Sequence, residues 1–122
     1  MTITAGGCHC NATRFELAHA PAEVTSCNCS ICAKRGALWA YYQPSEVTFT
    51  RHEADSTYQW GARMCTFHFC PQCGCSTYNE TPSWTEKGPD PDHPLIAINA
   101  RLIDDFDPDA VPVRKVDGKN QW

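Results

Sequence analysis

The sequence Cys70-Pro71-Gln72-Cys73-Gly74 places two cysteines three positions apart, with a proline between them and a glycine directly after them. Cysteines at this spacing can direct both sulfur atoms at one metal ion when the chain turns between them. Pro71 presets the backbone angle of the first turn position, and Gly74 can adopt a left-handed conformation that lets the backbone approach the sulfurs. The pattern predicts a zinc knuckle and disfavours the alternative of two cysteines that are merely buried beside a turn.

Two further cysteine groups precede the knuckle. They are Cys8-His9-Cys10 and Cys27-Asn28-Cys29-Ser30-Ile31-Cys32. Residues two apart in an extended chain face the same side, so we expect both sulfurs of the first group to reach one metal while His9 points away. Two cysteine pairs supply four thiolates, which can enclose zinc, whereas a triplet supplies three and leaves one coordination position for water or a substrate. The cysteines therefore predict two zinc ions per chain, one in a closed site and one in an open site.

Spacing alone leaves the grouping of the cysteines open. Cys70, Cys73 and Cys75 repeat the spacing of the triplet in reverse, so it is not decided which cysteines share an ion. The triplet would form a closed site if Cys65, Cys75 or a histidine supplied a fourth ligand. We otherwise interpret Cys65 and Cys75 as extra buried thiols. Thiolate tetrahedra also suit iron, so iron can replace zinc during expression.

The size and composition of the chain narrow its class. Its 122 residues predict a single domain over residues 1–122. A net charge of -4 argues against a nucleic-acid-binding protein, which would carry a basic surface. Residues 1–7 lack the basic start and apolar stretch of a signal peptide, and the longest apolar run, residues 37–42, is too short to cross a bilayer. We therefore expect a cytoplasmic protein with no membrane contact, whose cysteines stay reduced and bind metal.

Short β-type patterns recur between turn signals, and helical periodicity is weak. Residues 13–17 and 47–51 alternate in a strand pattern. Further strands are predicted at residues 37–43, 57–60, 66–69, 76–79 and 95–99. We expect short helical turns after Cys29 and around residues 104–110, and a mobile loop at residues 88–94, while residues 113–122 carry no clear signal. The predicted fold class is mainly β, with small sheets and few short helices.

Basic and aromatic residues near the triplet are candidates for ligand binding. Lys34 and Arg35 follow it directly, and a guanidinium can hold a carboxylate through two hydrogen bonds. The alternative for this pair is a turn with two solvated cations. Arg63 and His68 are weaker candidates. The aromatic residues that could line a pocket, or simply fill the core, are Trp39, Tyr41, Tyr42, Trp60 and Trp84.

Three ordered motifs together resemble the glutathione-dependent formaldehyde-activating enzyme family, which also includes centromere protein V. They are Gly6-Gly7-Cys8-His9-Cys10, residues 27–37 and Phe69-Cys70-Pro71-Gln72-Cys73-Gly74, and the strand at residues 96–99 also fits. The resemblance implies a structural zinc held by Cys8, Cys10, Cys70 and Cys73, and an active-site zinc held by Cys27, Cys29 and Cys32. It also implies small antiparallel sheets around the structural zinc, the β-tent type of fold.

The resemblance also implies an activity, that of a zinc-dependent carbon–sulfur lyase of the S-(hydroxymethyl)glutathione synthase type. It would add a thiol such as glutathione to formaldehyde or a related aldehyde. Cys27, Cys29 and Cys32 would form the catalytic site, and Lys34 or Arg35 would pair with a carboxylate of the thiol. The rival hypothesis is a zinc-stabilised binding module without catalysis. A thiol-redox protein is disfavoured, because thiolates held on zinc are not free to cycle. A homodimer is compatible with either hypothesis.

Overall fold

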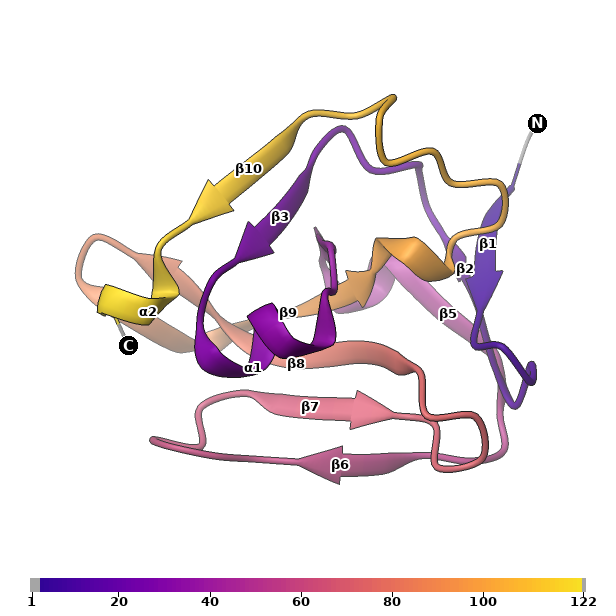
Figure 1. Ribbon diagram of the computed structural model, residues 1–122, viewed down its shortest axis with the longest axis horizontal. Coiled ribbons are helices and arrows are strands. Elements are labelled where there is room, and N and C mark those ends of the chain that lie inside the picture. The colour runs from indigo at the N-terminus through magenta and orange to yellow at the C-terminus, as the bar shows by residue number, and fades with distance from the viewer. Residues whose placement is uncertain (1–2, 122) are drawn as a thin grey trace.

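The computed structural model describes residues 3–121, and its architecture is mainly β, as the sequence predicted (Figure 1). The elements in chain order are β1 (Thr4–Gly7), β2 (Thr13–Leu17), β3 (Val24–Cys27), α1 (Ser30–Arg35), β4 (Trp39–Tyr42), η1 (Pro44–Glu46), β5 (Val47–His52), β6 (Ser56–Tyr58), β7 (Thr66–Phe69), β8 (Ser76–Thr85), β9 (Gly88–Asn99), η2 (Ala100–Leu102), β10 (Val113–Val116) and α2 (Gly118–Gln121). Neither described α-helix is long and apolar enough to cross a membrane.

The strands form two sheets. One has three strands in the order β1-β2-β5, and the other has seven in the order β10-β3-β4-β9-β8-β7-β6. Neighbouring strands are antiparallel except β10 and β3, which are parallel. Figure 1 shows the three-stranded sheet to one side of the longer one, with α1 in front of β8 and β9.

The main hydrophobic core lies on one face of the seven-stranded sheet. Ala40, Ile98 and Tyr78 are register partners on β4, β9 and β8, and all three belong to this core. Phe15 and Leu17 enter it from β2 of the three-stranded sheet. Burying an apolar side chain of this kind stabilises a fold by about 1.5–3 kcal/mol. The core therefore joins the two sheets and leaves the opposite face of the larger sheet for other contacts.

That opposite face carries one row of register partners from five neighbouring strands. The row is Tyr58, Phe67, Asn79, Ala97 and Tyr41, from β6, β7, β8, β9 and β4 respectively. Side chains alternate between faces along a strand, which places this row on the face away from Ile98 and Tyr78. Ala97 packs in a separate buried cluster with Cys32 of α1 and with Trp39. The start of α1 and the cysteines around it therefore lie over the second face, which we call the α1 face.

The predicted mobile loop at residues 88–94 is wrong. These residues form the first part of β9, and residues 88–90 pair with β8, where Thr85 lies opposite Gly88 and Ser83 lies opposite Asp90. Residues 91–94 fall in a register shift and have no register partner on β8, and only residues 96–99 pair with β4. A proline is tolerated on a strand edge that needs no donor, which explains how a Pro-rich segment stays in the sheet.

Other predictions of secondary structure are confirmed or need correction. The strand at residues 66–69 and the helical turn after Cys29 are both present, as β7 and α1. Residues 104–110 hold hydrogen-bonded turns, such as Ala110 N–H to the Asp107 carbonyl at 3.1 Å, but no helix. Strands β1, β3 and β10 were not predicted, because each is four residues long and none shows a clear alternation.

Candidate functional site

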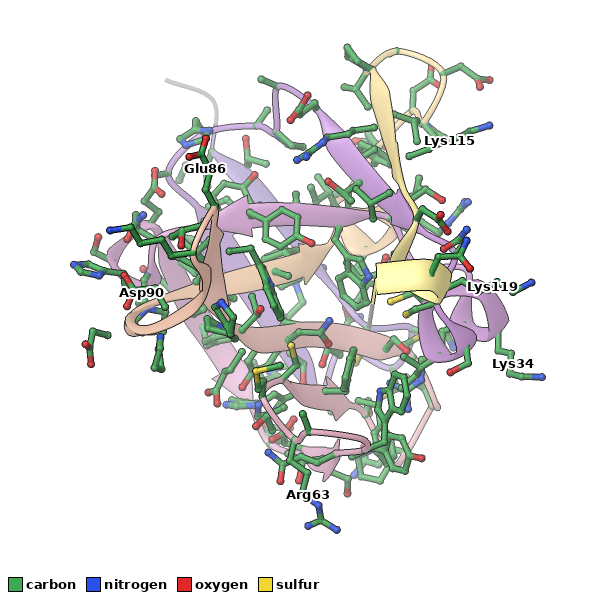
Figure 2. The ribbon with its side chains drawn as sticks, turned by 90° about the vertical axis from the view of Figure 1, so that its left-hand side faces the viewer. Lys34, Arg63, Glu86, Asp90, Lys115 and Lys119 are labelled. Carbon is green, nitrogen blue, oxygen red and sulfur yellow. The ribbon has the colours of Figure 1, made fainter. Side chains whose placement is uncertain are left out.

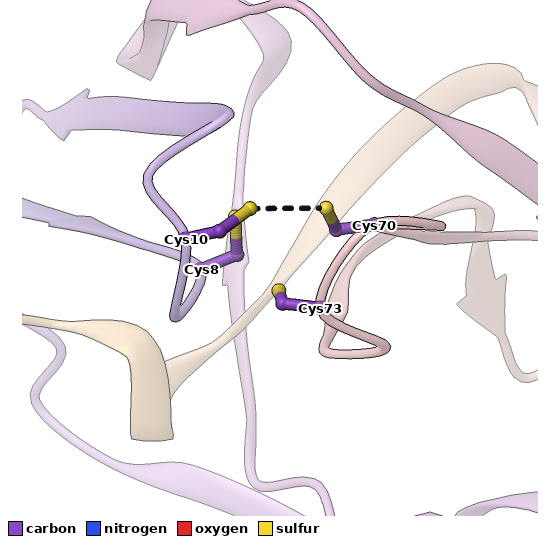
Figure 3. A group of neighbouring side chains, drawn as sticks. All are labelled: Cys8, Cys10, Cys70 and Cys73. Atoms are coloured by element: carbon purple, nitrogen blue, oxygen red, sulfur yellow. Dashed lines mark hydrogen bonds between the residues drawn. The ribbon is translucent and has the colours of Figure 1, made fainter.

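Four cysteines from two distant parts of the chain converge on one point (Figure 3). Cys8 and Cys10 come from the β1–β2 connection, Cys70 and Cys73 from the β7–β8 connection, and their sulfurs all lie within 4.8 Å of one another. We call this set the four-thiol cluster. The Cys10 sulfur is 3.6 Å from that of Cys70 and 3.8 Å from that of Cys8. Zinc–sulfur bonds of about 2.3 Å place tetrahedral sulfurs about 3.8 Å apart, so the cluster has the dimensions of a zinc site.

Local backbone conformation brings these sulfurs together. Gly74 has a φ of 83°, and its N–H donates to the Cys70 carbonyl at 2.7 Å, which closes the predicted knuckle. The chain at Cys8 is not extended, which corrects that expectation. It turns instead: the N–H of Asn11 donates to the Cys8 carbonyl at 3.0 Å, and Asn11 has a φ of 64°. Both segments are turns, so each can point two sulfurs inward.

The thiols of this cluster have different pKa values, because ionisation of one thiol disfavours ionisation of its neighbours. Burial alone would raise the pKa of Cys73, but hydrogen bonds from the backbone N–H groups of Cys75 and Cys10 and from neighbouring thiols lower it to about 6. The pKa of Cys10 is lowered by a backbone hydrogen bond at Ala12, yet desolvation and the thiols of Cys70 and Cys8 raise it to about 12. Like charges this close cannot all form without a cation. All nine cysteines of the chain lie within residues 3–121 and are free thiols, so this donor set fits a thiophilic metal such as zinc.

Cys27, Cys29 and Cys32 form a second group, the three-thiol cluster. Their sulfurs also lie within 4.8 Å of one another, and all three residues are buried. Cys27 ends β3, Cys29 directly precedes α1, and Cys32 lies within α1. Gly36 ends the helix in the left-handed conformation, so the chain leaves α1 toward β4. There Trp39 donates its Nε1–H to the Cys32 sulfur at 3.4 Å.

The structure separates the alternatives that spacing left open. Among residues 3–121, neither thiol cluster contains a further His, Cys, Asp or Glu ligand atom within the same 4.8 Å limit. Cys75 neighbours the knuckle and packs beside Cys8, but it is not part of the group. Cys65 donates to the Thr81 hydroxyl at 3.4 Å. The three-thiol cluster therefore offers three protein ligands and fits the predicted open site.

Burial also governs ionisation around the three-thiol cluster. It raises the pKa values of Cys27 and Cys32. Burial acts on Cys29 in the same direction, but hydrogen bonds from the backbone N–H groups of Cys32 and Ile31 and from the neighbouring thiols lower its pKa. Partial desolvation, with the nearby Cys32 and Cys27 thiols, raises the pKa of Tyr41 to about 12, although the residue is 45% exposed. Tyr41 therefore keeps its proton at neutral pH beside a cluster in which one thiol ionises first.

The C-terminal segment closes over the chain between Cys27 and Cys29. Asn28 donates its side-chain N–H to Asp117 at 2.9 Å and accepts the backbone N–H of Lys119 at 2.9 Å. The N–H of Asn28 also donates to the Val116 carbonyl at 3.3 Å. We call these three bonds the Asn28 latch. Sequence reasoning missed it, because residues 113–122 carry no pattern of their own and the partner lies about 90 positions away.

The two basic residues after the cysteines differ in environment. Lys34 is exposed, and Figure 2 shows its side chain pointing away from the protein. The guanidinium of Arg35 lies 5.7 Å from the ring centroid of Phe69 and 6.0 Å from that of Tyr58. Its Nη1 is buried and has no hydrogen-bond partner. Of the two cations, Arg35 is the one held over the α1 face.

The weaker candidates lie elsewhere. His68 is buried, stacks on Tyr78 at a centroid distance of 4.1 Å, and bonds to Asp55 at 2.8 Å. Because Tyr78 belongs to the main core, His68 faces away from the three-thiol cluster. Arg63 borders a surface hollow of about 430 Å³ beside the β8–β9 hairpin. That hollow has no cysteine in its lining.

Comparison with known proteins identifies the family. The model of the family described as glutathione-dependent formaldehyde-activating enzyme matches residues 3–116. The chain belongs to this family. A solved structure of a Rhodobacter sphaeroides protein is also similar, with 29% sequence identity and a TM-score of 0.69. That match covers 89% of this chain and 98% of the other. The resemblance that the cysteine motifs indicated is confirmed, and membership implies a function related to glutathione and formaldehyde activation.

Proposed function

We propose that this protein is a zinc-dependent carbon–sulfur lyase that runs as a synthase and adds a thiol, with glutathione as the leading candidate, to formaldehyde or a related aldehyde. The observation that carries the proposal is the three-thiol cluster, a set of three protein ligands beside a face with polar and aromatic side chains. A zinc site with three protein ligands keeps one position for a substrate. The four-thiol cluster, with its full set of ligands, would hold the structural zinc.

The residues have distinct roles in this proposal. Cys27, Cys29 and Cys32 would hold the active-site metal, and Trp39 orients the Cys32 sulfur. Zinc, when bound, would lower the pKa of a coordinating thiol, which as a free thiol is about 8.5. Arg35, or Lys34 beside it, would bind a carboxylate of the incoming thiol. The Asn28 latch keeps the segment between Cys27 and Cys29 in place.

The reaction itself is an addition without oxidation or reduction. The thiol sulfur forms a bond to the carbonyl carbon, and the carbon–oxygen π pair moves to oxygen. The thiol proton ends on that oxygen, delivered through water, and the product is a hemithioacetal. Thiols add to aldehydes readily without help, so the chain mainly needs to bind and orient the thiol.

The test is the rate of hemithioacetal formation from glutathione and formaldehyde, measured by NMR exchange spectroscopy with protein that carries two zinc ions. Wild type is expected to increase this rate, and Cys29→Ser is expected to abolish the increase while the fold persists. Cys65→Ser is the matched control, because Cys65 lies outside both clusters. A Cys29→Ser variant with wild-type rates would overturn the proposal and favour the zinc-stabilised binding module.

We also propose a cytoplasmic location for the protein. Free thiols at all nine cysteines suit a reducing environment such as the cytoplasm. Oxidation would remove the donors that both clusters supply. Activity is therefore expected to fall after treatment with a disulfide-forming oxidant and to return with a reductant and zinc.

A further inference from the structure

Asn79 is a buried polar residue in the middle of the α1 face. It is 6% exposed, and its side-chain Oδ1 is buried without a hydrogen-bond partner. Leaving a buried polar atom unpaired costs about 1–3 kcal/mol, so such an atom calls for a partner. Its register neighbours on this face are Phe67 on β7 and Ala97 on β9, which donate nothing from their side chains.

Ala97 links Asn79 to the three-thiol cluster. It is the register partner of both Asn79 and Tyr41, and it packs in one cluster with Cys27, Cys29 and Cys32. Neighbouring strands lie about 4.8 Å apart, so Asn79 is one strand away from the residue under the thiols. Only the small side chain of Ala97 comes between the carboxamide and the cluster in this row, and Tyr41 lies on the other side of Ala97.

Arg35 supplies a second unpaired polar atom near the other end of the same row. Its guanidinium lies close to Tyr58, which begins the row, and to Phe69, and its Nη1 is buried without a partner. Cation–π contacts with two rings hold the guanidinium in place. Arg35 comes three residues after Cys32, about one turn of α1. Tyr58 and Tyr41 are 49% and 45% exposed, so solvent reaches both ends of the row.

The chemistry of the two orphaned atoms defines a ligand. A carboxamide matches a peptide bond, because Oδ1 accepts an N–H while the amide nitrogen can donate to a carbonyl. A guanidinium matches a carboxylate. A chain of two or three residues spans roughly 7–10 Å when extended, which is the scale of the distance between Asn79 and the Tyr58 end of the row.

From this placement, and on the basis of the proposed function, we infer that the α1 face recognises a peptidic thiol through two contacts: Asn79 binds a peptide bond, and Arg35 binds a terminal carboxylate. The thiol group itself would then reach the three-thiol cluster. Lys34, which points away from the protein, takes no part. Glutathione makes both contacts, so Asn79 and Arg35 set its preference over simple thiols, which lack a peptide bond and bind weakly.

Calorimetry on zinc-loaded protein tests this with four probes: glutathione, S-methylglutathione, the glycine ethyl ester of glutathione, and 2-mercaptoethanol. Wild type is expected to bind glutathione at least about tenfold more tightly than the ester or 2-mercaptoethanol, since tenfold corresponds to one good hydrogen bond. S-methylglutathione lacks an ionisable thiol and reports the two contacts without the metal chemistry. These comparisons between ligands use the wild-type chain, so they do not depend on whether a variant folds.

Variants of Asn79 and Arg35 then test which residue makes each of the two contacts with the ligand. Asn79→Leu, which keeps the branched shape of the side chain, and Asn79→Ala are each expected to weaken binding of glutathione and S-methylglutathione about tenfold and to leave binding of 2-mercaptoethanol unchanged. Arg35→Ala is expected to weaken binding of glutathione but not binding of its glycine ethyl ester. Lys87→Ala, at the β8–β9 turn, is the control for loss of one positive charge. Circular dichroism and the zinc content confirm that each variant is folded and loaded.

The outcomes separate this inference from the proposed function. Equal wild-type affinity for glutathione and 2-mercaptoethanol, or wild-type affinity for glutathione in Asn79→Leu, overturns the inference and leaves thiol addition standing. An effect of Lys34→Ala as large as that of Arg35→Ala overturns the assignment to Arg35. Binding of S-methylglutathione that depends on Asn79 and Arg35, without any rate increase with formaldehyde, supports recognition and overturns the proposed reaction. No binding of any thiol overturns both.

Discussion

The two thiol clusters use the same ligand chemistry over very different sequence separations. Cys10 and Cys70 are 60 positions apart, so the four-thiol cluster ties the β1–β2 connection to the β7–β8 connection. The three-thiol cluster lies within six consecutive residues of one connection, Cys27 to Cys32. A link that closes a long loop restricts the unfolded chain strongly, whereas a local link restricts it little. The four-thiol cluster is therefore placed to stabilise the fold, whereas the three-thiol cluster, whose cysteines are buried beside the α1 face, adds little restraint and suits the binding role proposed above.

The largest expected effect comes from breaking the four-thiol cluster. Cys73→Ser is expected to unfold or aggregate the protein. Binding of structural zinc contributes about 10–16 kcal/mol to folding, which is comparable to the entire free energy of unfolding of a typical domain. Cys29→Ser is expected to lose one zinc of two and to keep most of the thermal stability. Thermal unfolding and elemental analysis on both variants measure this. Equal loss of stability in the two variants would remove the distinction between the clusters.

The two clusters also differ in how much of their structure could be predicted from the sequence. The two groups of cysteines were predictable, because both the knuckle with its Pro71 and the triplet are local patterns, and the family resemblance supplied the pairing with Cys8 and Cys10. The surroundings of the three-thiol cluster were not predictable. Asn79 becomes a neighbour of Ala97 only through strand register, and no local pattern marks a residue for that position.

The same limit explains the errors in secondary structure. Residues 88–94 contain prolines and glycine, which locally indicate a loop, but pairing of residues 88–90 with β8 outweighs this preference and the strand continues through residue 94. The turn at Cys8 depends on Asn11 in a left-handed conformation, which an extended pattern does not reveal. Tertiary pairing therefore decided these segments, whereas the local spacing of the cysteines indicated the candidate metal ligands.

An intermediate effect is expected from the Asn28 latch, which lies beside only one of the clusters. Asp117→Ala removes the partner of the Asn28 side chain and frees the segment between Cys27 and Cys29. Loss of such supporting bonds typically weakens metal binding 10–100-fold, and we expect about tenfold here. Competition with a chelator, monitored by a colorimetric zinc indicator, should show faster loss of one zinc and an unchanged second. Asp109→Ala serves as the control for charge, and equal zinc release from all three proteins would count against the latch.

The smallest expected effect concerns an ion pair beside the four-thiol cluster. Arg14, on the strand that follows the Cys8–Cys10 turn, holds Asp104 through contacts of 2.7 and 3.3 Å. The side chains are 30% and 53% exposed, so solvent screening limits the pair to about 0.5–1 kcal/mol. Hydrogen bonds from Arg14 lower the pKa of Asp104 below its ordinary value of 3.8. A carboxyl with a lowered folded pKa stabilises the protein above its unfolded pKa, and this contribution is lost as pH falls through the folded value.

Asp104→Asn is therefore expected to reduce the free energy of unfolding at pH 7 and to converge with wild type as the pH falls below about 4. Urea unfolding at pH 7, 5 and 3.5 measures the difference, with Asp92→Asn as a control of equal charge at an exposed position. The result sharpens the comparison of the two clusters, because protonation of the zinc-binding thiolates also destabilises the protein in acid. Asp104→Asn subtracts the contribution of this one carboxylate, and the acid loss that remains combines the cysteines with the other carboxyls of lowered pKa, Glu46, Asp90 and Asp117. A difference that stays constant from pH 7 to 3.5 would show that Asp104 acts without its charge.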